Sequence, residues 1–166
     1  MPAPGVDAAA IVRTLLDHGV RFVVVGGFAV ELWDVAVRPT IDVDITPEHS
    51  KRNLGRLADA LNQLGAGLRL GDETVMVPGG FTAANLQEMR VLNLSTSVGP
   101  LDLTIFPAGT EGYPDLVRNA TEIEFQGVMV PTAALEDVAR SKEAAGRPKD
   151  LVTLPAIRAH LDRRRR

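Results

Sequence analysis

The sequence predicts an α/β (α+β) fold, a mixed sheet with flanking helices that is closed by a C-terminal helical segment. Two patterns carry this prediction. Short β-branched and aromatic runs such as Val20–Val25 alternate with stretches of helical periodicity, such as the leucines between positions 54 and 64. At 41–45, apolar residues alternate strictly with aspartates, as in a strand that buries one face. Strands and helices are therefore interleaved along the chain.

The composition is that of one ordinary globular domain. The chain has 166 residues, of which 45% are hydrophobic and 23% are charged. We expect a single domain over 1–166, with an α/β core at about 20–130 and a basic helical segment at about 131–166. There is no cysteine, which excludes disulfides and thiolate metal sites. With no signal-peptide pattern and no apolar run of membrane length, the expected location is cytoplasmic, with no membrane partner.

In the first half of the chain, a capping side chain, a proline or a glycine marks most element ends. The expected elements are a helix capped by Asp7 that runs to about His18, a strand at 20–25, a short helix at 28–35, a strand at 41–45, and a long helix from Pro47 to Leu64.

In the second half, the patterns are weaker between 66 and 88, where strand pieces near 68–70 and 74–77 are expected. The remaining elements are strands at 90–94 and 101–106 joined by a turn at 97–100, short strands at 122–125 and 128–130, a helix from a Thr132 cap to about Ala145, and a last helix from Pro148.

Three aspartates are the strongest candidates for chemistry. Asp42 and Asp44 are two residues apart on one predicted strand, so their carboxylates share a face. Neighbouring carboxylates repel one another, and a divalent cation removes that cost. Asp102 has the same placement on another strand and would serve either as a third metal ligand or as the base that deprotonates a hydroxyl. Such clusters carry metal-dependent phosphoryl chemistry.

A glycine pair separates the first strand from the following helix. Backbone amides at such a junction can hold a phosphate, and glycine lets the backbone approach closely. Gly26-Gly27 lacks the third glycine of a dinucleotide-binding motif. The pair therefore indicates a phosphate contact only together with the aspartates that follow it.

The stretch VVVGGFAVELWDVAVRPTIDVDI resembles the core signature of the DNA polymerase β-like nucleotidyltransferase superfamily, and LDLTIF resembles the strand that supplies its third carboxylate. The RPT-x-D-x-D form and the later KEAAGRPKD, at Lys142–Asp150, resemble the AbiEii and MenT type of toxin–antitoxin nucleotidyltransferases. The resemblance spans about 20–155 in separate blocks and leaves 60–90 and 107–130 unmatched. Many relatives have a serine where this chain has Gly27.

The resemblance implies a nucleotidyltransferase-type mixed sheet and a set of site residues. Mg²⁺ (or Mn²⁺) would be held by Asp42, Asp44 and Asp102, and Lys142 would complete the catalytic set. The substrate would be an NTP, and CTP or another pyrimidine nucleotide is among the candidates. The nucleotide-binding residues would be Gly26, Gly27, Arg38, Thr40, Lys149 and Asp150.

The implied activity is that of a toxin that adds a nucleotide to the 3′ end of tRNA and blocks aminoacylation, with a cognate antitoxin as its partner. Residues 140–166 carry a net charge of +6, and the rest of the chain carries −9. A basic end indicates a polyanion partner, although Arg163–Arg166 alone could equally be a solubilising tail. The expected RNA-binding residues are Arg147, Arg158, Arg163 and Arg164.

Two other functions are compatible with the sequence. One is a nucleotidyltransferase that modifies a small molecule, such as an antibiotic, or a protein side chain. The other is a non-catalytic regulatory or binding module, against which the three aspartates argue. Thr40 is also a speculative phosphorylation site, since a phosphate there would place negative charge beside the metal site.

Overall fold

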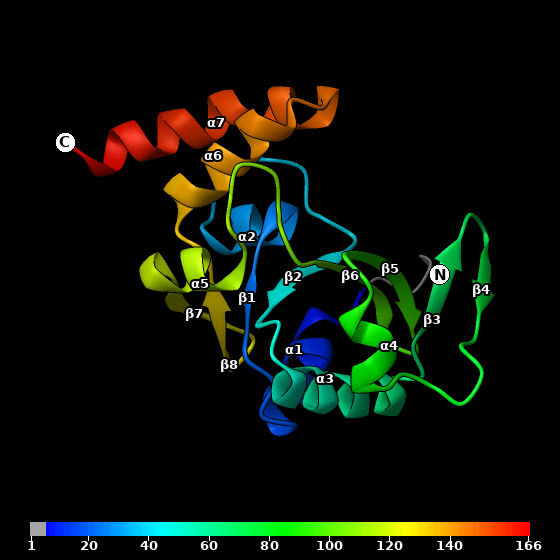
Figure 1. The fold of residues 1–166 in the computed structure, drawn as a ribbon. Coiled ribbons are helices and arrows are strands. Elements are labelled where there is room, and N and C mark those ends of the chain that lie inside the picture. Colours follow the sequence, from blue (N-terminus) through cyan, green and yellow to red (C-terminus); the bar gives the residue numbers. More distant parts are fainter. Residues whose placement is uncertain (1–5) are drawn as a thin grey trace.

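The computed structural model describes residues 6–166, and these form a mixed α/β structure (Figure 1). The strands are β1 (Phe22–Val24), β2 (Val43–Pro47), β3 (Gly67–Leu70), β4 (Glu73–Val75), β5 (Val91–Thr96), β6 (Gly99–Thr104), β7 (Thr121–Phe125) and β8 (Val128–Thr132). The helices are α1 (Ala8–Asp17), α2 (Gly26–Leu32), α3 (Lys51–Gln63), α4 (Ala83–Gln87), α5 (Tyr113–Leu116), α6 (Leu135–Ala145) and α7 (Pro148–Arg164), and η1 (Val117–Asn119) is a 3-10 turn. The predicted fold class is confirmed.

All of these strands join one sheet in the order β4-β3-β5-β6-β2-β1-β8-β7. At its centre β2 runs parallel to β6, and Asp44 lies opposite Asp102 in the register. Neighbouring strands are about 4.8 Å apart. The pairing of β2 with β6 therefore brings together two aspartates that are 58 positions apart in the sequence.

Helices cover the sheet from two sides (Figure 1). The helices α1 and α3 lie together on one side, and the α6–α7 pair lies on the other, beyond α2. Leu54, Leu57 and Leu61 form the predicted apolar stripe of α3 and are buried against the sheet. The cleft that contains the candidate site is lined by residues of β2, β6, α6 and α7, among others.

Two helix starts differ from the prediction. The helix α3 begins at Lys51 rather than Pro47, because Pro47 ends β2 and the Ser50 side chain accepts the first capping hydrogen bond, from Asn53 N at 3.2 Å. Thr132 belongs to β8, and its hydroxyl donates to Val130 O at 2.8 Å, so it cannot cap α6. A cap-type residue predicts a helix start only when no strand pairing competes for it.

Near the glycine pair, the observed element ends also shift. The helix α2 includes both glycines and begins at Gly26 instead of position 28. The strand β2 begins at Val43, and Ile41 is 73% exposed, so the predicted inward orientation of Ile41 is wrong. Asp42 therefore lies in a bend directly before the strand.

The region with weak sequence patterns folds into short elements. The expected strand pieces near 68–70 and 74–77 are confirmed as the β3–β4 hairpin. The helices α4 and α5 are absent from the prediction, because five and four residues are too few to show helical periodicity. A signal for α4 existed, since Thr82 and Asn85 form a capping box. Within 6–166, no helix is both long enough and apolar enough to cross a membrane.

Candidate active site

A cleft of about 820 Å³ opens between the centre of the sheet and the α6–α7 pair, and we call it the central cleft. It gathers residues that are far apart along the chain. Every residue predicted to act in catalysis or nucleotide binding lines it: Gly26, Gly27, Arg38, Thr40, Asp42, Asp44, Asp102, Lys142, Lys149 and Asp150.

The three predicted aspartates converge on the floor of the central cleft. Burial, together with the neighbouring carboxylates of Asp102 and Asp42, raises the pKa of Asp44 to about 7, although Lys149 and Lys142 oppose the shift. Burial also raises the pKa of Asp102, and Asp42 adds to this effect through charge and a hydrogen bond, against the lowering effect of Arg69. The protein thus concentrates negative charge that it does not fully neutralise with its own cations.

Gly26 is required by the geometry beside Asp44. Its φ is +62°, and a Cβ at this position would lie 2.6 Å from Asp44 Oδ2. The backbone also joins the two segments, since Val25 N donates to Asp44 O at 2.9 Å. Only glycine lets the start of α2 approach the carboxylate this closely. At Gly27 the nearest atom to a built Cβ is Thr40 Oγ1 at 3.4 Å, which is tight but less restrictive.

Thr40 orders the bend that carries Asp42. Its hydroxyl accepts from Asp42 N at 3.2 Å and donates to Asp42 O at 3.1 Å. These contacts fix the aspartate backbone just before β2 begins. The hydroxyl is therefore engaged with the backbone rather than projecting freely into the central cleft.

Arg69 is a cleft residue that sequence reasoning missed. Its Nη2 donates to Asp102 Oδ1 at 2.6 Å, and its Nη1 donates to Leu94 O at 2.7 Å. It comes from β3, in the stretch where the sequence pattern is weakest. No local signal predicts it, because its partner lies two strands away in the sheet.

The late motif forms a buried ion cluster between α6 and α7. Asp150 is fully buried and accepts from Lys142 Nζ at 3.4 Å and from Arg147 Nε at 2.7 Å. Burial opposes ionisation, but the hydrogen bond from Arg147 and the charge of Lys142 outweigh it, so the pKa of Asp150 lies below its usual value. Asp150 therefore orients Lys142, while Arg147, expected to contact phosphate, pairs mainly with Asp150.

The other residues predicted to bind RNA lie outside the central cleft, on α7. Arg158 pairs with Glu143 at 3.2 Å, and Arg164 pairs with Glu136 at 3.5 Å. The Arg164 guanidinium also lies 4.8 Å from the centroid of the Trp33 ring. Arg163 is in the last turn of the helix. Several basic groups of this segment are thus engaged by acidic groups of the same protein.

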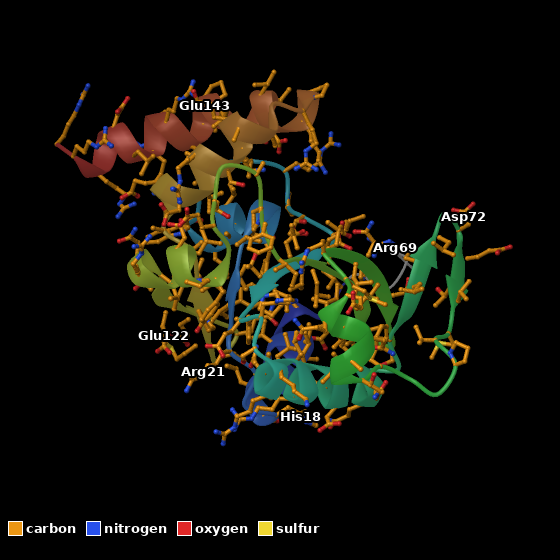
Figure 2. All side chains as sticks on the ribbon, in the orientation of Figure 1. His18, Arg21, Arg69, Asp72, Glu122 and Glu143 are labelled. Atoms are coloured by element: carbon orange, nitrogen blue, oxygen red, sulfur yellow. The ribbon has the colours of Figure 1, made fainter. Side chains whose placement is uncertain are left out.

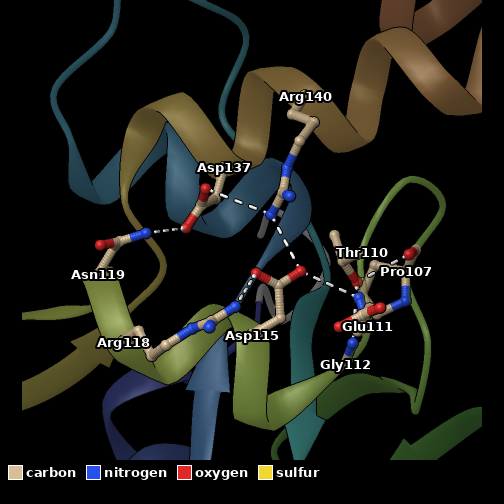
Figure 3. Close-up of polar contacts among 9 residues, drawn as sticks. All are labelled: Pro107, Thr110, Glu111, Gly112, Asp115, Arg118, Asn119, Asp137 and Arg140. Atoms are coloured by element: carbon tan, nitrogen blue, oxygen red, sulfur yellow. Dashed lines mark hydrogen bonds and ion pairs between the residues drawn. The ribbon is translucent and has the colours of Figure 1, made fainter.

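A second polar cluster, shown in Figure 3, supports the wall of the central cleft formed by Pro107, Ala108 and Thr110. Asp115 is its centre. The carboxylate accepts from Glu111 N at 3.0 Å, from Arg118 at 3.3 Å and from Arg140 at 3.1 Å.

Arg140 extends this cluster to Asp137 at 3.3 Å. The loop is thereby linked to α6, the helix that carries Lys142. The backbone hydrogen bond from Glu111 is the largest of the contacts that hold the pKa of Asp115 below its usual value, although burial opposes it.

The donor set of the cleft fits a hard divalent cation, because carboxylate oxygens are the ligands such ions prefer. In the arrangement adopted by residues 6–166, however, no three His, Asp or Glu groups are gathered closely enough to form a complete metal site. A cation would therefore take part of its coordination from another source, such as a phosphate.

Comparison with known proteins gives relatives by structure only. No family model matches the chain, and no curated protein matches it by sequence. Its structure is similar to that of the lincosamide antibiotic adenylyltransferase LnuA in its lincomycin-bound form, with a TM-score of 0.61 and 14% identity over 92% of this chain and 94% of that one.

Two further structures are similar. The antibiotic-resistance factor ANT(2'')-Ia has a TM-score of 0.57 and 16% identity, over 92% of this chain and 83% of that one. TM1012 from Thermotoga maritima, assigned as a nucleotidyltransferase, has a TM-score of 0.56 and 16% identity, over 89% and 87%. At these identities the likeness concerns the fold. The chain has the nucleotidyltransferase fold.

Proposed function

We propose that this protein is a divalent-metal-dependent nucleotidyltransferase that moves a nucleotide from an NTP to an acceptor hydroxyl and releases pyrophosphate. One observation carries the proposal: Asp42, Asp44 and Asp102 converge in a cleft whose opposite wall presents Lys142 and Lys149. Carboxylates facing lysines across a cleft suit a triphosphate with its cation. The nucleotidyltransferase fold of the neighbouring structures supports the same reaction class.

The unbalanced charge at Asp44 supports a cation at this site. A carboxyl group with a pKa of about 7 lacks sufficient positive charge around it, and Mg²⁺ or Mn²⁺ would supply that charge. Asp42 and Asp44 would hold the ion, with Asp102 as a third ligand or as the base. A bound divalent cation would neutralise charge on the triphosphate and stabilise the oxygens of the displacement.

The protein groups have separate tasks in the proposed reaction. Lys142, held by Asp150, and Lys149 would neutralise phosphate charge, together with Arg38, which also lines the cleft. Gly26 lets the start of α2 approach the Asp44 carboxylate, which would place the Gly26-Gly27 backbone beside the triphosphate. The acceptor oxygen attacks the α-phosphorus, the bond to the β-phosphate oxygen breaks, and pyrophosphate leaves. The proton of the acceptor hydroxyl passes to a base, for which Asp102 is the candidate.

For the acceptor, we propose the 3′ end of tRNA, with CTP or another pyrimidine NTP as donor. The protein would then be a toxin that blocks aminoacylation and that a cognate antitoxin neutralises. The basic end of the chain supports an RNA acceptor, since phosphate contacts supply most non-specific affinity for nucleic acids. The resemblance of 142–150 to the AbiEii and MenT type points to the same acceptor.

A small hydroxylated molecule is the second candidate acceptor. Two of the similar structures are antibiotic-modifying proteins. The pairing of Arg158 and Arg164 with acidic groups also leaves less free positive charge for RNA than the sequence suggests. This candidate requires no basic surface outside the central cleft.

The acceptor is tested by incubating the purified protein with Mg²⁺ and each α-³²P-labelled NTP. Parallel reactions would contain total tRNA, a panel of aminoglycosides and lincosamides, or a protein extract. We expect label to enter tRNA from one or two NTPs. Label on a small molecule or on a protein would instead support the second acceptor class or a protein side chain.

The controls use one variant inside the cleft and one outside it. Asp42→Ala should abolish transfer. Glu122→Gln, on the exposed face of β7, should leave it unchanged (Figure 2). If the wild-type protein binds no NTP in the presence of Mg²⁺, the nucleotidyltransferase proposal is wrong, and a non-catalytic binding module is the remaining reading.

A further inference from the structure

Arg69 places a permanent positive charge inside the carboxylate cluster. Its Nη2 lies 2.6 Å from Asp102 Oδ1, and the two side chains are only 26% and 17% exposed. Arg69 pairs with Thr74 within the β3–β4 hairpin, and Figure 2 shows Asp72 at the tip of this hairpin. An arginine guanidinium carries a positive charge in proteins. It is therefore a fixed counter-ion for Asp102.

The sheet holds this guanidinium in place. Leu68 of β3 pairs with Leu94 of β5, and Asn93 of β5 pairs with Asp102 of β6. The Leu94 carbonyl accepts the second Arg69 hydrogen bond at 2.7 Å. One guanidinium nitrogen donates to the backbone and the other donates to the carboxylate. Rotation of the side chain away from Asp102 would therefore break two charge-assisted hydrogen bonds.

The contact changes which groups are available to a cation. A cation shared by all three aspartates would need oxygens of Asp102, and Oδ1 is already engaged by Arg69. Within the described residues, no three acidic or histidine side chains form a complete metal site. Asp42 and Asp44 remain available, and together with a triphosphate they can complete the shell of one ion.

We propose that the Arg69 guanidinium replaces a second divalent cation, so that the site takes one cation for each bound NTP. This inference rests on the proposed nucleotidyltransferase function. Asp42, Asp44 and the triphosphate would hold the single ion. Arg69 is a positioning residue: it keeps Asp102 out of the coordination shell and leaves the other oxygen of Asp102 to accept the proton of the acceptor hydroxyl.

The test is a count of Mn²⁺ ions bound in the presence of a saturating α,β-methylene NTP analogue. Free Mn²⁺ is measured by electron paramagnetic resonance, and bound nucleotide by equilibrium dialysis of the same sample. We expect one Mn²⁺ per bound nucleotide for the wild-type protein and two for Arg69→Gln. Arg90→Gln is the matched control, because this arginine lies over the Phe106 ring outside the cleft, and it should keep one.

A second variant makes the test independent of how well Arg69→Gln folds. Asp102→Asn should keep one Mn²⁺ with an affinity within about threefold of wild type, because Asp102 is not a ligand in this scheme. Two Mn²⁺ ions on the wild-type protein, a single ion on folded Arg69→Gln, or a tenfold loss of Mn²⁺ affinity in Asp102→Asn would each overturn the inference while leaving the proposed function intact. Failure of the wild-type protein to bind nucleotide at all would overturn both.

Discussion

At the scale of single residues, the candidate site depends on close contacts that permit no substitution. Gly26 and Asp44 are 18 positions apart in sequence, yet a methyl group on Gly26 would overlap the Asp44 carboxylate. The glycine pair was predicted as a phosphate contact. The structure gives a different reason for glycine at position 26, namely its close approach to Asp44. The sequence could not give this reason, because it does not give the distance between the start of α2 and β2.

Gly26→Ala should therefore damage the site. The positive φ costs about 1 kcal/mol for a residue with a Cβ, and the overlap displaces Asp44 in addition. We expect at least a tenfold loss of Mn²⁺ affinity, measured by electron paramagnetic resonance with the NTP analogue present. Gly55→Ala is the control, since a Cβ there meets nothing within 4 Å and sits inside α3. It should bind Mn²⁺ normally and be more stable by about 0.5–1 kcal/mol.

Asp44 should also give the metal-free protein an unusual pH dependence. Its pKa in the folded protein, about 7, is above the value of 3.8 expected in the unfolded chain. Ionised Asp44 therefore opposes folding, and its contribution should raise stability as the pH falls from about 7 toward about 4. The slope is at most about 1.4 kcal/mol per pH unit. Urea unfolding at several pH values measures it. Asp44→Asn should flatten the profile, and an unchanged slope in this variant would contradict the assignment.

At the scale of secondary-structure elements, the α6–α7 pair brings the late motif to the carboxylates. The sequence predicts Gly146 and Pro148 as the boundary between two helices, and the structure confirms both roles. It does not predict that Asp150 is fully buried, because burial depends on how α7 packs on α6. In the structure the buried Asp150 carboxylate contacts Lys142 and so orients this lysine.

Asp150→Asn should lower both stability and nucleotide affinity. The substitution leaves the buried end of Lys142 without its partner charge, which costs about 3 kcal/mol in comparable buried pairs. Thermal unfolding and NTP-analogue dialysis would measure the two effects. Glu143→Gln, whose pair with Arg158 is exposed, should cost less than about 1 kcal/mol and leave binding unchanged (Figure 2). Equal losses of stability and of nucleotide affinity in the two variants would mean that burial of the Asp150 carboxylate is unimportant.

Long, periodic elements and strongly alternating strands could be predicted from the sequence, whereas contacts made across the sheet could not. The α3 stripe and the position of Asp44 on a strand could be predicted from spacing alone, whereas Asp42 lies in the bend before that strand. Arg69 is the clearest counter-example, since its role depends on β3 lying beside β5 and β5 beside β6. Sheet order is a property of the folded chain, so the residues around position 69 do not predict the contact with Asp102.

At the scale of the whole molecule, charge is divided between an acidic body and a basic C-terminal end. Lys142 and Lys149 of this basic end line the central cleft, whereas its last arginines lie outside the cleft. Arg163 and Arg164 lie in the last turn of α7, outside the residues that line the central cleft. Binding of the nucleotide and binding of a polyanion acceptor should therefore be separable by mutation.

Removal of residues 163–166 tests this separation. If tRNA is the acceptor, the truncated protein should bind tRNA at least about tenfold more weakly in 50 mM salt, with a shallower dependence on salt concentration. Binding of the NTP analogue should remain within twofold of wild type. Filter binding at several salt concentrations measures the affinity for tRNA and its dependence on salt. Unchanged tRNA binding and an unchanged salt slope would favour the small-molecule acceptor.

The most direct test of nucleotidyl transfer follows the α-phosphate and the γ-phosphate of the NTP in parallel reactions. Wild-type protein, Mg²⁺ and a cell extract that supplies all acceptor classes would be incubated in parallel with α-³²P-labelled and γ-³²P-labelled NTP. The account predicts that the α label becomes attached to an acceptor while the γ label leaves as pyrophosphate. It also predicts that Asp44→Asn abolishes both events and that Glu122→Gln preserves both. Release of the γ label as free phosphate without attachment of the α label, or full transfer by Asp44→Asn, would contradict the account.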